Sequence, residues 1–142
     1  MSTFAVELDV HRRMVHTSLS GLFDEASIEA WAKEYEAATD RFRGRMHVVL
    51  ADMRGLKTMR KEVADRFGAA IGYARAHGVV LCAHISDETV QRLQASRVAR
   101  QNSEGDDVTV DVASLDEAKL VCAEALERID DARPVSTVRI PA

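Results

Sequence analysis

The sequence has few cysteines, few prolines and few aromatic residues, and it has no long apolar run. Two of its 142 residues are cysteine, two are proline and 5% are aromatic. Cys82 and Cys122 stand alone in apolar segments, without the spacing of a zinc site or a redox dithiol, so we expect two buried, reduced thiols. No stretch reaches the roughly 20 apolar residues of a membrane-spanning helix, and no signal-peptide pattern follows Met1. These absences predict a cytoplasmic protein with no membrane insertion.

An excess of positive charge is also missing. The chain has 19 basic and 23 acidic residues and a formal net charge of −4, which argues against a nucleic-acid partner. The charge is nevertheless uneven, because residues 41–61 include seven basic residues and one acidic residue, whereas residues 104–131 include ten acidic and two basic ones. This polarity either orients self-association or the docking of a partner, or it reflects two solvated faces.

What the sequence does contain is typical of one globular domain. Hydrophobic residues make up 46% of the chain and charged residues 30%. A chain of this length buries roughly 68–70% of its unfolded surface, so it needs no disulfides to fold. No internal repeat or low-complexity tract is present. We expect a single domain over residues 1–130 and a C-terminal tail over residues 131–142, which contains Pro134 and Pro141.

Hydrophobic periodicity predicts alternating strands and helices. Apolar and polar residues alternate in two early segments, as in an antiparallel hairpin, and short apolar runs further on are typical of strands covered on both faces. The predicted strands are residues 4–10, 15–19, 46–51, 79–85 and 108–112, and the predicted helices are 24–42, 60–77, 87–102 and 115–129. This order predicts an α/β domain with a mixed, mostly parallel sheet, an N-terminal antiparallel hairpin and about four helices.

The run VVLADMRGLKTM ends a predicted buried strand with Asp52, LSGLFDEAS leads from a predicted strand into the first helix, and VDVASLDEAKLV leads from the last strand into the final helix. All three resemble segments of the STAS domain, which is named after sulphate transporters and anti-sigma-factor antagonists. The resemblance extends from Phe4 to Ile129. It implies a STAS-like fold in a small bacterial domain that binds a protein partner or a small ligand and performs no chemistry of its own.

One motif of that family is missing from the chain. In the family's anti-sigma antagonists, a serine in an Asp-Ser-Ser-Gly motif at a helix start is phosphorylated to switch partner binding. Alignment on Asp52 places this motif at residues 60–63, which are Arg, Lys, Glu and Val, and Thr58 is the nearby hydroxyl. The chain is therefore more similar to STAS-like proteins without that serine, some of which are compared with lipid-binding Sec14-like folds.

The segment after Asp52 holds the candidate binding residues. Arg54, Lys57, Arg60 and Lys61 surround the predicted helix start, where free backbone N–H groups and the helix dipole favour an anion. The segment lacks the glycine pattern of a phosphate-binding loop, and its basic residues have the alternative of pointing into solvent. Asp52 itself is either a functional acid or a cap for the following turn. We predict a contact surface made of Asp52, Arg54, Thr58, Arg60, Lys61 and Glu62.

Catalytic and metal-binding patterns are missing. The five histidines form no His-x-x-x-His or His-Glu-x-x-His pair, so we predict no metal site and no cofactor. His16 and His47 are placed to approach each other across adjacent strands, but no Gly-x-Ser-x-Gly elbow supplies a serine nucleophile for any histidine. The sequence therefore argues against an enzyme.

The remaining choice is between two kinds of binding protein. The favoured hypothesis is a non-catalytic regulatory or protein-interaction domain that forms a homo-oligomer. The alternative is a protein that binds a small apolar, lipid-like or anionic ligand. Trp31, Tyr35 and Phe42 share one helical stripe, which is either core packing or the lining of a groove for an apolar ligand.

Overall fold

The computed structural model describes residues 1–86 and 108–138 of the chain, with side chains up to residue 129. The elements run in the order β1 (Ser2–Asp9), β2 (Met14–Gly21), α1 (Glu25–Asp40), β3 (His47–Asp52), α2 (Lys61–Ala76), β4 (Val79–Ile85), β5 (Thr109–Val112) and α4 (Leu115–Val138). The five predicted strands are confirmed. The predicted helix at residues 87–102 lies outside the described residues, and three helices lie within them.

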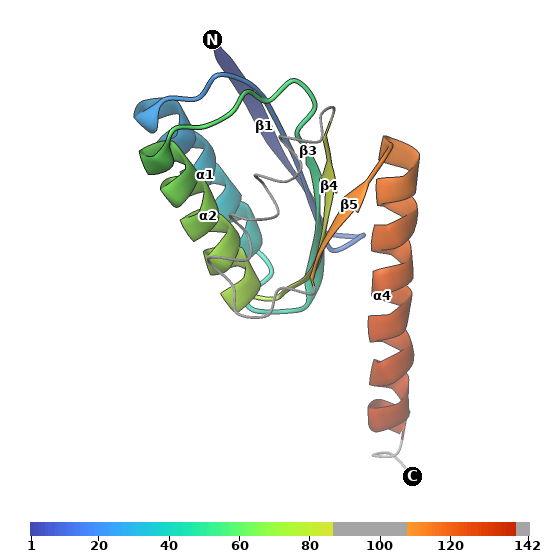
Figure 1. The fold of residues 1–142 in the computed structure, drawn as a ribbon. Helices are drawn as coiled ribbons and strands as arrows, with labels where there is room; N and C mark the ends of the chain where they lie inside the picture. Colours follow the sequence, from blue (N-terminus) through green and yellow to red (C-terminus); the bar gives the residue numbers. More distant parts are fainter. Residues whose placement is uncertain (87–107, 139–142) are drawn as a thin grey trace.

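The strands form one mixed sheet in the order β1-β2-β3-β4-β5 (Figure 1). β1 pairs with β2 in antiparallel register, with Phe4 opposite Leu19, and all other neighbours are parallel. The alternation of residues in the hairpin places Val15 and Leu19 in the core and leaves the other face of these strands more exposed to solvent. The predicted α/β class, with a mostly parallel sheet and an N-terminal hairpin, is confirmed.

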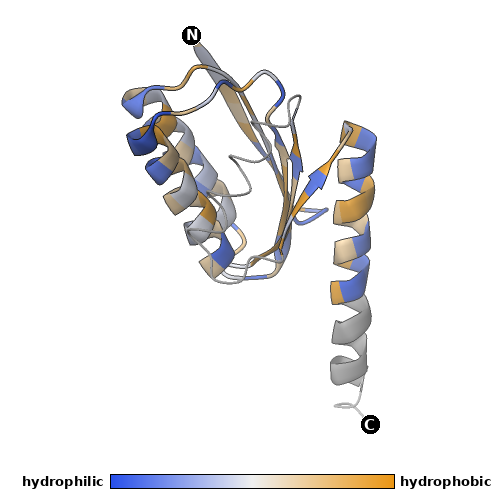
Figure 2. Cartoon of the chain, viewed as in Figure 1, coloured by the Kyte–Doolittle hydropathy of each residue, from blue (hydrophilic) through white to orange (hydrophobic). Residues whose placement is uncertain are grey.

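Helices cover both faces of the sheet, which explains why β3 is apolar from Val48 to Ala51. α1 and α2 lie on one face and α4 lies on the other (Figure 1). Val49 belongs to the core under α1 and α2, whereas its neighbours Val48 and Leu50 belong to the core under α4. Figure 2 shows the middle strands in mostly hydrophobic colours between helices of mixed character. A strand buried on both faces cannot alternate apolar and polar residues.

The aromatic stripe of α1 is core packing. Trp31, Tyr35 and Phe42 are each at most 2% exposed, and the rings of Trp31 and Tyr35 stack with centroids 4.8 Å apart. The Trp31 indole N–H donates to the Thr17 hydroxyl at 2.9 Å, which fixes the helix over β2. These side chains therefore do not line a groove for an apolar ligand, which was the alternative interpretation of the stripe.

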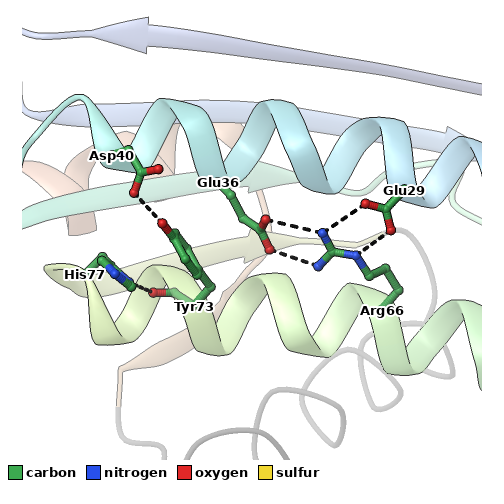
Figure 3. Close-up of polar contacts among 6 residues, drawn as sticks. All are labelled: Glu29, Glu36, Asp40, Arg66, Tyr73 and His77. Carbon is green, nitrogen blue, oxygen red and sulfur yellow. Dashed lines mark hydrogen bonds and ion pairs between the residues drawn. The ribbon is translucent and has the colours of Figure 1, made fainter.

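Polar side chains join α1 to α2 along their outer edges (Figure 3). Arg66 lies between Glu29 and Glu36, and its guanidinium N–H groups donate to Glu29 at 2.8 Å and to Glu36 at 2.9 Å. Further toward the carboxyl ends of the two helices, the Tyr73 hydroxyl donates to Asp40 at 2.6 Å. One planar guanidinium can bind two carboxylates at once, so it fixes the two helices side by side.

α1 begins with a capping box, and α4 ends later than predicted. Asp24 accepts from the Ser27 N–H at 2.8 Å, and the Ser27 hydroxyl accepts from the Asp24 N–H at 2.9 Å, which makes a reciprocal capping box. The predicted end of the last helix at residue 129 is wrong, because the α4 backbone continues to Val138. The apolar stripe ends at Ile129, so periodicity could not reveal the last turns. The division into a domain of residues 1–130 and a tail of residues 131–142 stays a prediction.

Candidate functional site at the carboxyl edge of the sheet

The candidate residues lie in residues 52–62, which we call the β3–α2 segment. This segment leaves the carboxyl end of β3 and enters the first turn of α2. Every third side chain anchors it in the core, because Met53, Leu56 and Met59 are at most 7% exposed. The side chains between these anchors are exposed, namely Arg54, Lys57 and Thr58, as are Arg60, Lys61 and Glu62 after them. The segment therefore presents its polar side chains outward from a fixed backbone.

Backbone hydrogen bonds tie the β3–α2 segment to Gly21, the last residue of β2. The Gly21 N–H donates to the Gly55 carbonyl and the Lys57 N–H donates to the Gly21 carbonyl, both at 2.9 Å. Gly55 has a positive φ of 84°, and a Cβ there would lie 2.7 Å from the Ser20 hydroxyl oxygen. The positive φ favours glycine at residue 55, and a larger side chain there would also force the Ser20 hydroxyl to move. Carboxyl ends of neighbouring parallel strands lie at one edge, so the loops after β2 and β3 meet.

Asp52 acts as the cap of its own turn and pairs with Arg54. One Asp52 oxygen accepts from the Arg54 backbone N–H at 3.2 Å and from the Arg54 Nε at 2.9 Å, and the other accepts from Nη2 at 2.7 Å. The guanidinium lowers the pKa of the Asp52 carboxyl below its ordinary value. Of the two alternatives for Asp52, this geometry matches the cap.

Other cations of the segment also face acids. Arg60 lies 3.7 Å from a Glu25 oxygen of α1, and Lys61 donates to Asp65 at 2.9 Å, a contact that raises the pKa of Lys61. Lys57 makes no ion pair within the described residues. Glu25 was not recognised in the sequence as a neighbour of this segment. The available signal was its place after the adjacent parallel strand, whose loop must share the same edge.

The start of α2 is open, in contrast to the start of α1. Arg60 occupies the N-cap position of α2 and makes no side-chain capping hydrogen bond. The first backbone N–H groups of the helix therefore have no acceptor from the N-cap side chain, and Glu62 supplies a carboxylate in the first turn. Thr58 lies two residues before this start and is exposed. The edge thus combines a helix start without a side-chain cap, an exposed hydroxyl and charges of both signs.

The histidines do not assemble into a second site. His16 lies opposite Leu50 in the β2–β3 register, whereas His47 contacts Thr39 and stacks on Phe42 with centroids 4.3 Å apart. The predicted approach of His16 to His47 is therefore wrong, because β2 and β3 pair in a different register. Among the described residues, no three His, Cys, Asp or Glu side chains gather to hold a metal ion.

Comparisons with known proteins identify the fold. No protein-family model matches the chain, and no curated protein matches it in sequence. Among solved structures, it is similar to the crystal structure of an anti-sigma factor antagonist from Mycobacterium paratuberculosis, with a TM-score of 0.56 and 13% identity. The match covers 86% of this chain and 94% of the other. The chain therefore has the STAS-like fold that its sequence resemblance implied. None of the helices in residues 1–86 and 108–138 has the length and apolar character needed to cross a bilayer.

Proposed function

We propose that this chain is a non-catalytic, STAS-like regulatory domain and that the β3–α2 segment is its contact surface for a protein partner. The observation that carries the proposal is the fixed outward display of polar side chains between the anchors Met53, Leu56 and Met59. A surface that is already ordered loses little conformational entropy when a partner binds. The anti-sigma factor antagonist of similar fold supports the same class of function.

The proposed contact does not depend on a phosphoserine at the start of α2. Arg60, Lys61 and Glu62 stand where the serine motif of the family's phosphorylated members would fall. Two cations there favour a partner surface that carries carboxylates, because exposed complementary charges steer association and fix its register. Their neighbours Glu25 and Asp65 leave this charge partly balanced within the chain.

Quantitative affinity capture from a bacterial lysate tests the proposal. The full chain is immobilised beside a variant with Arg54→Ala, Arg60→Ala and Lys61→Ala, and captured proteins are compared by mass spectrometry. A control variant removes three exposed cations elsewhere, through Lys33→Ala, Lys119→Ala and Arg128→Ala. We expect one protein to be captured by the wild type and the control and lost from the first variant. Equal capture by all three, or no specific capture, would contradict the proposal.

A small anion is the second candidate for the same edge. The open N-terminus of α2 favours it, because unpaired backbone N–H groups and the helix dipole attract a phosphate or carboxylate. Lys57 supplies an exposed cation nearby without an internal ion pair among the described side chains. Native mass spectrometry of the freshly purified chain should then show a retained mass that Lys57→Ala reduces. A spectrum of the bare chain alone argues against this candidate.

A further inference from the structure

Exposed arginines gather at the end of the sheet opposite the β3–α2 segment. Arg12 lies in the hairpin turn, and Arg41, Arg43 and Arg45 lie between α1 and β3. We call these four residues the basic edge. Backbone hydrogen bonds of 2.9 Å join the turns there, one from the Val48 N–H to the Arg13 carbonyl and one from the His47 N–H to the Gly78 carbonyl. Figure 1 shows the turn between α1 and β3 beside the turn between α2 and β4 at the lower end of the sheet.

Acids balance this edge only in part. Asp9 lies 3.8 Å from Arg12, and Asp40 accepts the Tyr73 hydroxyl. Arg41 and Arg43 make no ion pair within the part of the chain that the structure describes. The edge therefore has an excess of positive charge, although the whole chain is negative.

Apolar side chains accompany these arginines. Val10 is 54% exposed beside the hairpin turn, and Met46 is 49% exposed next to Arg45. A groove of about 850 Å³ opens beside the hairpin turn, with Met14 and Leu50 on the sheet side and Leu126 on the α4 side. The lining also includes the charged side chains Glu7, Asp9 and Lys119. Arginine and methionine next to a depression with apolar walls are typical of protein-protein contacts.

The outward face of α4 has the opposite character. Asp116, Leu120, Glu124 and Glu127 recur at helical spacing and are exposed, and Leu120 is 60% exposed. We call these four residues the acidic stripe. The opposite side of α4 packs on the sheet through Ala118, Cys122 and Ala125. Among the described side chains, no ion pair joins the acidic stripe to the basic edge of the same chain.

We infer that the basic edge of one copy of this chain binds the acidic stripe of a second copy. Four arginines face three carboxylates in this contact, and the groove gives Leu120 of the second copy an apolar place to dock. A polyanion such as nucleic acid fits less well, since the whole chain has a net charge of −4 and nucleic acid offers no apolar side chain to the groove. Two different surfaces meet in this contact. The assembly is therefore either a dimer, in which each copy binds the acidic stripe of the other, or an open filament of many copies. This contact is separate from the β3–α2 segment and does not rest on the proposed function.

Sedimentation velocity of the full chain tests the contact. Two charge-reversed variants are compared with the wild type, Arg41→Glu with Arg43→Glu and Glu124→Arg with Glu127→Arg. We expect each to weaken self-association by roughly tenfold or more, because like charges then face each other. The variant with all four changes restores opposite charges across the contact and should associate again. Added salt should weaken the wild-type assembly, since exposed charges are screened beyond roughly 10 Å at 0.1 M ionic strength.

Controls separate this contact from a general effect of charge. Lys33→Glu changes the net charge as much as the single reversal Arg43→Glu does, but Lys33 is exposed on α1 and belongs to neither the basic edge nor the acidic stripe. Association should therefore persist with Lys33→Glu and weaken with Arg43→Glu. Circular dichroism checks that each variant is folded. A wild-type monomer at every concentration, or weakening by only one of the two reversals, would overturn the inference. Binding of duplex DNA that is lost on Arg41→Glu with Arg43→Glu, without self-association, would overturn it in favour of a nucleic-acid surface.

Discussion

The Trp31 indole N–H donates to the Thr17 hydroxyl at 2.9 Å, and that hydroxyl donates in turn to the Ala5 carbonyl at 2.8 Å. This relay joins α1, β2 and β1 inside the core, where Trp31 and Thr17 are each 1% exposed. A buried indole N–H needs an acceptor, and the hydroxyl is the group that supplies it.

Thr17→Val should therefore destabilise the fold although valine has nearly the same shape. The substitution leaves the Trp31 N–H buried without an acceptor, at a cost of about 1–3 kcal/mol in the free energy of unfolding, measured with urea. Thr17→Ser keeps the hydroxyl and should cost less. Trp31→Phe should reduce the free energy of unfolding less in the Thr17→Val background than in the wild type, because the indole N–H has already lost its acceptor there. Equal stability of Thr17→Val and wild type would contradict this role.

Asp52→Asn separates the capping role of Asp52 from its charge. The amide keeps an oxygen for the Arg54 backbone N–H but loses the ion pair, whose side chains are 19% and 48% exposed. An exposed pair contributes about 0–1 kcal/mol, so we expect a small loss of stability on urea unfolding. Asp52→Ala also removes the backbone hydrogen bond and should lose about 0.5–1.5 kcal/mol more. Equal effects of the two substitutions would mean that the cap contributes nothing.

Arg66→Gln should weaken the fold at neutral pH and matter less in acid. The guanidinium lowers the pKa of Glu29 below its ordinary value of 4.5, so the stability from this contact is complete above pH 4.5. It is lost as the pH falls through the lowered pKa of the folded state. Urea unfolding of both proteins at several pH values should show curves that converge in acid. Parallel curves would contradict the assigned contact.

His47 should make the free energy of unfolding depend on pH in a higher pH range than Glu29 does. Its Nδ1 faces the Arg45 carbonyl at 2.8 Å and must therefore donate, which leaves Nε2 to accept from the Thr39 hydroxyl. Burial lowers the pKa of His47 below 6.5, so the unfolded chain binds a proton more readily. The stability from neutral His47 is complete above pH 6.5 and declines below it. His47→Gln should flatten this part of the curve, and an unchanged slope would contradict the prediction.

Gly44 and Gly78, both near the basic edge, allow the cost of a positive φ to be separated from the cost of a steric clash. Both have positive φ, 80° at Gly44 and 114° at Gly78. A Cβ at Gly44 meets nothing within 4 Å, whereas a Cβ at Gly78 would lie 2.4 Å from the Arg45 carbonyl oxygen. Gly44→Ala should cost about 1–2 kcal/mol through the backbone conformation alone. Gly78→Ala should cost clearly more on thermal unfolding, and the reverse order would contradict the close approach.

Much of the fold followed from local pattern. The alternation in residues 4–19 and the apolar runs at 46–51 and 79–85 predicted elements that the structure contains. These signals are local because side-chain periods of two and 3.6 residues reflect which face of an element is buried. The last turns of α4 escaped prediction because they follow the end of the apolar stripe.

The candidate site was predictable only as a segment of chain. The residues of the β3–α2 segment are consecutive, so the sequence grouped Asp52 with Arg54 without any knowledge of the fold. Glu25 as a neighbour of Arg60, and the hydrogen bonds between Gly21 and the segment, depend on β2 and β3 being parallel neighbours. Periodicity does not state which strands pair or in which register, as the separation of His16 from His47 illustrates.

The sequence by itself determined the class of fold, the order of its elements and the side of each element that is buried. Only the tertiary structure decided that the cations of residues 41–61 separate into two groups at opposite ends of the sheet. Arg41, Arg43 and Arg45 precede β3, whereas the cations from Arg54 onward follow it. A strand is extended and runs from one end of the sheet to the other, so the residues before it and after it are separated in space although they are close in sequence. Charge that looks like one cluster in the sequence thus becomes two surfaces with different neighbours.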